Sequence, residues 1–93
     1  MIRSFADKET ERVFVRDRSP RFSPDLQRKA WKKLAILHAA GSLHDLRVPP
    51  GDRLEKLAAS RQGQHSIRIN DQWRICFVWK DGDAYQVEIA DYH

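Results

Sequence analysis

Arginine side chains recur in the C-terminal half of this 93-residue chain, with a spacing that suits the binding of a phosphate group. Arg68 precedes and Arg74 follows the polar segment 70–72 (NDQ), whose composition is typical of a hairpin loop. A three-residue loop there pairs Ile67 with Ile75 on one face of a sheet and places Arg68 opposite Arg74 on the other face. Two facing arginines repel each other, so we expect a negative group beside them.

The negative group beside these arginines can come from the protein or from a ligand. Glu88 is expected on the same face as Arg74, where its carboxylate could neutralise the arginines internally. A phosphate could neutralise them from outside, because a guanidinium group presents a fork of donors that matches phosphate oxygens. The sequence leaves both alternatives open.

The position of Glu88 depends on the register of the second hairpin, which turns near residues 81–83 (DGD). We prefer a three-residue loop, because it keeps one face of the sheet uniformly apolar. This register pairs Trp79 with Tyr85, Phe77 with Val87 and Ile75 with Ile89, and leaves on the opposite face Arg68, Arg74, Glu88 and Tyr92. The rival is a two-residue turn, which would move Tyr92 off the face of Arg74.

The elements that must position these residues are read from the hydrophobic pattern. Segments 65–69, 73–79 and 85–92 are rich in β-branched and aromatic residues, which predicts strands, and short strands are also expected at 1–5 and 54–59. Apolar residues recur at three- and four-residue steps over 24–40, which predicts the longest helix. Asp7 can cap a shorter helix at 8–15, and a helical turn is expected at 42–46. Helices followed by an antiparallel sheet make an α+β fold.

A single domain is expected to span residues 1–93, because the chain is too short for two domains. Residues 16–24 (RDRSPRFSP) combine prolines, serines and arginines without periodicity, which predicts a flexible loop between the helices. This loop could contact RNA or a protein partner, or serve only as a solvated linker.

The composition limits the class of partner and of chemistry. The net charge of +4 and a pI of about 9.6 favour anionic partners such as nucleic acid, although a basic solvated surface explains them equally well. Cys76 is the single cysteine, and the four histidines show no metal-ligand spacing, so we expect no disulfide, no metal and no cofactor. We find no signal peptide and no apolar segment that could span a membrane, so a cytoplasmic protein is expected.

Four segments together resemble the HigB-type toxins of the RelE superfamily: 53–55 (RLE), 61–70 (RQGQHSIRIN), 72–77 (QWRICF) and 88–93 (EIADYH). The resemblance is close in the C-terminal half and extends to the N-terminal half as a layout of elements. It implies a RelE-like compact antiparallel sheet covered by two N-terminal helices. It also implies the toxin of a type II toxin–antitoxin system, a metal-independent endoribonuclease (mRNA interferase) that inhibits growth by cleaving mRNA in the A site of the ribosomal 30S subunit.

The resemblance also implies partners for the chain. A cognate helix-turn-helix antitoxin would neutralise the toxin, and the complex would reach operator DNA through the antitoxin and repress its own operon.

Residue by residue, the family pattern suggests roles in the site. Arg74 matches the catalytic arginine, Tyr92 matches the tyrosine of the closing motif, and Glu55 falls where the superfamily places a general base. The remaining site residues are the flanking His93, as a further catalytic candidate, and five candidates for RNA binding, namely Arg61, Arg68, Lys56, His65 and Asp91.

These roles suit the attack of a ribose 2′-OH on the adjacent phosphate. Glu55 would take the proton of the 2′-OH, Arg74 with Arg61 or Arg68 would stabilise charge on the phosphate, and Tyr92 or His93 would protonate the 5′-oxygen or stack on a base. DNA lacks this nucleophile, which explains a preference for RNA.

One position departs from the family pattern. Three residues after the base many relatives carry a catalytic lysine, whereas this chain has Ala58. In a strand, Lys56 would face the same way as Ala58 and opposite to Glu55. A weakly active or non-catalytic ribosome- or RNA-binding protein, which acts through its antitoxin and operon autoregulation, is therefore the alternative function.

Overall fold

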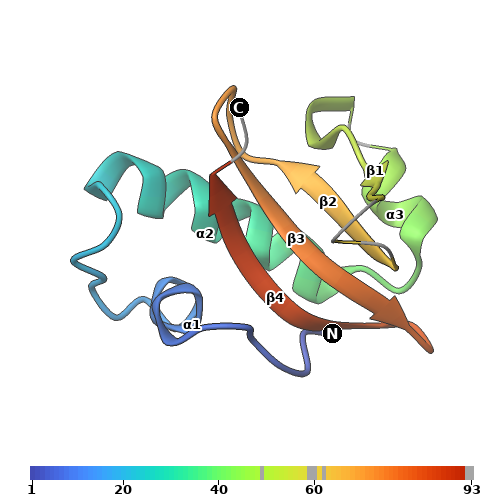
Figure 1. The fold of residues 1–93 in the computed structure, drawn as a ribbon, viewed down its shortest axis with the longest axis horizontal. Helices are drawn as coiled ribbons and strands as arrows, with labels where there is room; N and C mark the ends of the chain where they lie inside the picture. The colour runs from blue at the N-terminus through green and yellow to red at the C-terminus, as the bar shows by residue number, and fades with distance from the viewer. Residues whose placement is uncertain (49, 59–60, 62, 92–93) are drawn as a thin grey trace.

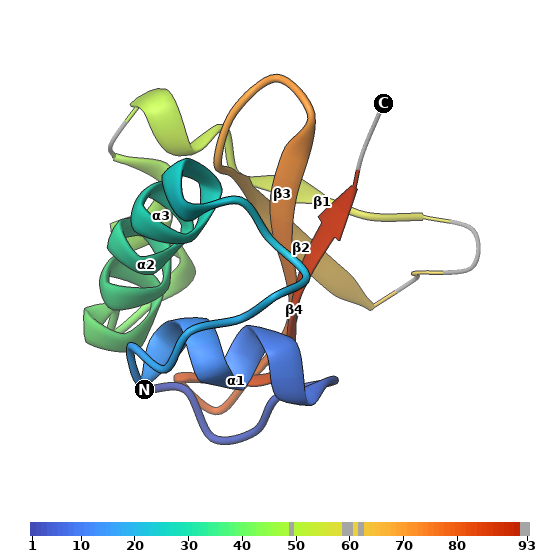
Figure 2. The same cartoon turned by 90° about the vertical axis from the view of Figure 1, so that its left-hand side faces the viewer.

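The predicted helices and sheet are present in the computed structural model, which describes residues 1–48, 50–58, 61 and 63–91 (Figure 1). A four-stranded antiparallel sheet has the order β1–β2–β3–β4, and its strands are β1 (Glu55–Lys56), β2 (Gln64–Arg68), β3 (Trp73–Lys80) and β4 (Asp83–Asp91). The helices α1 (Lys8–Phe14), α2 (Pro24–Ala39) and α3 (Leu43–Arg47) lie on one side of this sheet (Figure 2). The fold is α+β, as predicted.

Each helix begins at a side chain that satisfies its first backbone amides. The predicted cap Asp7 accepts a hydrogen bond from the amide of Thr10 at 2.7 Å and starts α1. Ser23 caps α2, with Pro24 in the first turn, where its missing amide hydrogen costs nothing. Ser42 forms a capping box with Asp45 at the start of α3, which confirms the helical turn predicted there.

The core lies between the helices and the facing side of the sheet. One apolar cluster contains Leu34 and Leu37 of α2, Ile67 of β2 and Ile75 of β3, and all four side chains are fully buried. This burial provides most of the stability of such a small domain.

The first hairpin has the predicted register. Residues 70–72 form the loop, Ile67 pairs with Ile75, and Arg68 pairs with Arg74. Asn70 stabilises the turn, because its side-chain oxygen accepts hydrogen bonds from the amides of Gln72 (2.9 Å) and Trp73 (2.8 Å).

The preferred register of the second hairpin is wrong at the turn and right near Arg74. The turn has two central residues, Asp81 and Gly82, both with positive φ, and Trp79 pairs with Ala84 rather than with Tyr85. Such a turn matches the twist of the two strands better than a three-residue loop does. A β-bulge near Gln86, whose φ is 53°, adds one residue to β4. The bulge restores the predicted pairing of Ile75 with Ile89.

Two of the predicted strands are shorter than expected. The segment 1–5 forms only two isolated parallel bridges to β4, at Ile2 and Phe5, and thereby covers the outer edge of that strand. Of the strand predicted at 54–59, only Glu55–Lys56 form β1, although the amide of Leu57 still donates to the carbonyl of Gln64 at 2.8 Å; residue 59 lies outside the described residues.

Candidate functional site

Arg74 lies on β3 with its side chain on the face of the sheet that the helices leave uncovered. Its partner across β2 is Arg68, and Ser66 and Cys76 share this face. Arg74 is buried, with 8% of the residue exposed, and several acceptors hold its guanidinium group. Its Nε donates to Ser66 Oγ at 2.7 Å, and its Nη2 donates to the carbonyl oxygens of Arg53 at 2.5 Å and Ser66 at 3.4 Å. These bonds fix the orientation of the guanidinium group.

The remaining nitrogen of Arg74 faces the predicted base. Nη1 lies 3.9 Å from Glu55 Oε1, and within the described part of the chain no acceptor is within hydrogen-bond distance of Nη1. The pairing of Glu55 with Ser66 places the carboxylate on the face of Arg74. The Glu55 side chain is 56% exposed, so a ligand can reach the space beside both groups.

A buried ion pair holds the segment that precedes Glu55. Asp52, in the 3-10 turn η1 (Pro50–Asp52), is fully buried, and its Oδ1 lies 2.5 Å from Nζ of Lys33 in α2. The next residue, Arg53, has a left-handed φ of 44° and presents its carbonyl oxygen to Arg74. The ion pair therefore connects the helix layer to the hydrogen bonds around Arg74.

Glu88 does not neutralise Arg74. Its carboxylate accepts a hydrogen bond from Arg61 Nη1 at 2.9 Å, and Ala90 is the residue of β4 that pairs with Arg74. The alternative in which the Glu88 carboxylate neutralises Arg74 within the protein is therefore wrong. Arg68 forms its own ion pair with the exposed Asp71.

Cys76 lies beside these charged groups and is fully buried. Burial raises the pKa of the Cys76 thiol; Arg61 and Arg74 oppose this effect, and Glu88 adds to it. A buried protonated thiol is a poor nucleophile.

Two predicted RNA-binding residues lie on the other face of the sheet. Lys56 pairs with His65, so both point away from the face of Glu55, as predicted for Lys56. The His65 ring stacks on Phe77 with ring centroids 6.1 Å apart, and its Nδ1 is buried with no partner in the described structure. Burial lowers the pKa of His65, and Lys56 and Arg47 lower it further. A neutral imidazole holds phosphate weakly.

The end of β4 borders a cavity of about 290 Å³. The predicted site residues Arg61 and Asp91 line it, and Asp91 accepts a hydrogen bond from Gln72 at 3.2 Å. Tyr92 and His93 follow directly and lie outside the described residues.

The sequence interpretation missed several residues around the site. Ser66 alternates with the isoleucines of β2, so its contact with Arg74 was readable from the pattern. Arg21 lines the same cavity as Arg61, and its neighbour Phe22 packs edge-on against Trp73 with ring centroids 5.7 Å apart. The only sequence signal for Arg21 is the arginine-rich segment 16–24.

Among the residues described, no group of three or more His, Cys, Asp or Glu side chains could hold a metal ion. The described helices are also too short or too polar to cross a membrane.

The chain is similar to known toxins over nearly its whole length. A family model described as the RelE-like toxin of type II toxin-antitoxin system HigB matches residues 3–93. Toxin HigB-1 of Vibrio cholerae is 41% identical over 85 residues, which cover 90% of each chain. Endoribonuclease HigB of Proteus vulgaris is 42% identical over 41 residues, which cover 44% of this chain and 45% of that protein. A solved YoeB-YefM complex from Staphylococcus aureus has a chain with a TM-score of 0.61 and 20% identity, covering 100% of this chain and 98% of that one.

Proposed function

The chain belongs to the HigB-like family of RelE-like toxins of type II toxin–antitoxin systems, and from this premise we propose that it is an endoribonuclease that cleaves messenger RNA. The name of the Proteus vulgaris relative supports this activity. The observation that carries the proposal is the position of Arg74 Nη1, 3.9 Å from the carboxylate of Glu55, whose side chain is 56% exposed.

The proposed reaction uses the ribose of the substrate as nucleophile. Glu55 takes the proton of the 2′-OH, the 2′-oxygen forms a bond to the adjacent phosphorus, and the bond to the 5′-oxygen breaks. Arg74 donates from Nη1 to the phosphate as negative charge builds on it. The leaving 5′-oxygen receives a proton from Tyr92 or His93. No metal is needed, because the guanidinium group supplies the positive charge.

The fixed orientation of Arg74 supports a catalytic role. Ser66 and the Arg53 carbonyl already hold two of its nitrogens, so little side-chain freedom is lost when a phosphate binds to the third. A positioned donor of this kind accelerates acyl or phosphoryl transfer by about 10²–10³-fold.

We propose that the bound RNA continues from Arg74 along the basic residues of the same face. Arg68 is 28% exposed and Arg61 is 32% exposed, so both can reach a neighbouring phosphate, and Asp91 lies beside the cavity at the end of β4. Lys56 and His65 lie on the opposite face, and any RNA contact they make is away from the reacting phosphate.

The biological setting follows from the family. We propose a cytoplasmic toxin that acts on mRNA in the ribosomal A site and is neutralised by a helix-turn-helix antitoxin. Operator DNA would be contacted by the antitoxin in the complex.

The test is induced expression in a bacterium, with growth measurement and mapping of mRNA 5′ ends. Arg74→Lys keeps a positive charge but loses the planar fork, so cleavage should fall by about 10²-fold or more while the protein stays folded. Lys80→Arg, an exposed substitution on the β3–β4 hairpin, is the matched control and should cleave like the parent. Unchanged cleavage in a folded Arg74→Lys protein would refute the site.

A second candidate function is supported by Ala58. It is exposed just after β1, at the position where the family resemblance implies a catalytic lysine. A protein that binds RNA at Arg74 but cleaves it slowly would inhibit growth weakly. In that case few or no new mRNA 5′ ends would arise on expression, while RNA binding would still depend on Arg74.

A further inference from the structure

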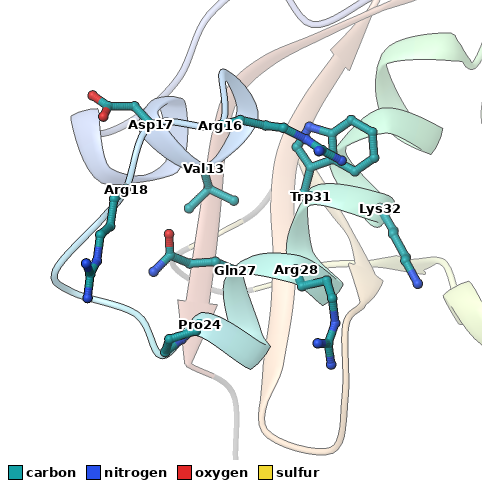
Figure 3. Close-up of a pocket in the computed structure, with 9 residues that line it drawn as sticks. All are labelled: Val13, Arg16, Asp17, Arg18, Pro24, Gln27, Arg28, Trp31 and Lys32. Atoms are coloured by element: carbon teal, nitrogen blue, oxygen red, sulfur yellow. The ribbon is translucent and has the colours of Figure 1, made fainter.

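A second cavity is lined by residues of α1, α2 and the connection between them, and Arg74 is not among its lining residues (Figure 3). It has a volume of about 470 Å³, within the range of about 300–1,000 Å³ that is typical of ligand pockets. We call it the α1–α2 pocket, because the end of α1, the connection that follows and the first half of α2 line it. Its apolar lining comes from Val13, Pro24 and Trp31.

The rim of the α1–α2 pocket is strongly basic. Arg16, Arg18, Arg28 and Lys32 line it, against a single carboxylate from Asp17. Arg28 pairs with Asp25, but the ion pairs found in the described structure involve none of the other three cations. The rim therefore complements a negatively charged ligand.

Arg16 occupies a backbone position that normally favours glycine. At the end of α1 the amide of Asp17 donates to the carbonyl of Arg12 at 2.8 Å, and the amide of Arg16 donates to the carbonyl of Val13 at 3.2 Å. This is a Schellman motif, whose left-handed residue is usually glycine, yet Arg16 has a φ of 62°. Its guanidinium carbon lies 3.8 Å from the ring centroid of Trp31 (Figure 3). A strained arginine kept over a tryptophan at a pocket rim suggests a role in binding.

Hydrogen bonds within the chain hold the wall of the pocket in the structure. Gln27 donates to the carbonyls of Ser19 (2.8 Å) and Phe22 (2.7 Å) and accepts from the amide of Ser19 (3.1 Å). Ser19 also donates through its hydroxyl to Glu9 at 2.6 Å. A pocket that is already formed loses less conformational entropy when a ligand binds than a pocket that must first become ordered.

We propose that the α1–α2 pocket binds an acidic peptide segment of a protein partner, with a large apolar side chain in the cavity and carboxylates on Arg16, Arg18 and Lys32. A peptide fits better than RNA, because Arg16 already covers a face of Trp31 on which a base would stack. Arginine also pairs with carboxylates through two parallel hydrogen bonds. Peptide binding here does not require the chemistry of Arg74, so the two proposals can fail separately.

The probe is a blocked peptide in which two leucines are flanked on each side by two glutamates, added to the full-length ¹⁵N-labelled protein. The indole N–H signals of Trp31, Trp73 and Trp79 report three different places in the fold. We expect a saturable shift at Trp31 and none at Trp73 or Trp79. A matched peptide with glutamines in place of the glutamates should bind about tenfold more weakly.

Arg16→Gly tests the pocket without a folding problem, because glycine adopts the left-handed conformation freely. It should unfold at the same temperature as the parent or higher, yet bind the acidic peptide about tenfold more weakly. Lys80→Gln removes one positive charge outside the pocket and should change the affinity less than twofold. Absence of a saturable shift at Trp31, or equal peptide affinity in parent and Arg16→Gly, would overturn the proposal. Tighter binding of a uridine octanucleotide at Trp31 would overturn it in favour of RNA.

Discussion

Removing the charge of Lys33 should destabilise the protein, because Lys33 is the counter-charge of a buried carboxylate. Asp52 is fully buried, and its Oδ1 lies 2.5 Å from Lys33 Nζ. Its other oxygen, Oδ2, has no hydrogen-bond partner in the described structure. The variant Lys33→Met would leave this carboxylate inside the protein without a positive partner.

The expected loss of stability follows from the burial of the pair. Breaking a buried ion pair by removing one partner costs about 3–5 kcal/mol. The Lys33 side chain is 21% exposed, so water reaches one end of the pair and we expect about 3 kcal/mol. A small domain has a free energy of unfolding of about 5–15 kcal/mol, so this is a large fraction of the total.

Urea unfolding followed by tryptophan fluorescence measures the effect. The midpoint for Lys33→Met should fall by about 1–3 M relative to the parent. The neighbouring Lys32→Met, an exposed substitution with the same change of charge, should change the stability by less than about 0.5 kcal/mol. Adding Asp52→Asn to Lys33→Met should recover most of the loss, because the double variant buries no unpaired charge.

Cleavage should also fall in Lys33→Met under conditions where the protein is folded. Asp52 directly precedes Arg53, whose carbonyl holds Arg74, so a looser η1 segment would loosen Arg74 as well. A Lys33→Met protein whose stability is within 1 kcal/mol of the parent would refute this reasoning. The same holds if the double variant is as unstable as the single one.

Three further predictions concern single positions. Ala58→Lys should raise the rate of RNA cleavage at least about tenfold over the parent and over Ala58→Gln, if the lysine of the family pattern is what the chain lacks; an unchanged rate would count against that role. His65 has a folded-state pKa below its ordinary value of 6.5, so the unfolded state binds more protons and stability should decrease as the pH falls below about 6.5. Urea unfolding of the parent and of His65→Phe at pH 5 and pH 7 should show a smaller pH dependence in the variant, and equal pH dependence would contradict the role of burial. Gln86→Gly should stabilise the protein by about 0.5 kcal/mol, because glycine relieves the positive φ; a lower unfolding temperature would show that the side chain outweighs the backbone.

The local elements and the first hairpin could be predicted because their signals are local. Ile67 and Ile69 alternate with Ser66 and Arg68, and this alternation determines which face of β2 is buried. A shift of the strand pairing by one residue would expose the isoleucines. The face of His65 could be read from the same alternation, which groups it with Ile67. We nevertheless predicted RNA binding for His65, because histidine side chains can contact phosphate.

Other parts of the site depend on tertiary packing and have no local signal. Lys33 and Asp52 are 19 residues apart, and nothing in either segment indicates that α2 and η1 meet. The contact of Arg74 with the Arg53 carbonyl likewise depends on the left-handed turn at Arg53. The sequence and its family resemblance therefore predict Arg74 and Glu55 as site residues, while the groups that orient Arg74 are visible only in the structure.

The extra residue of β4 near Gln86 shifts the pairing of β3 with β4 by one residue between the turn and the site. Without it, the two-residue turn would bring Ile75 opposite Glu88 and Arg74 opposite Ile89. The carboxylate would then point into the core, and an isoleucine would replace Ala90 beside Arg74. Loss of one residue at the bulge must therefore be balanced by one added residue in the turn. The hairpin tip can change length in evolution or engineering only when the bulge changes with it.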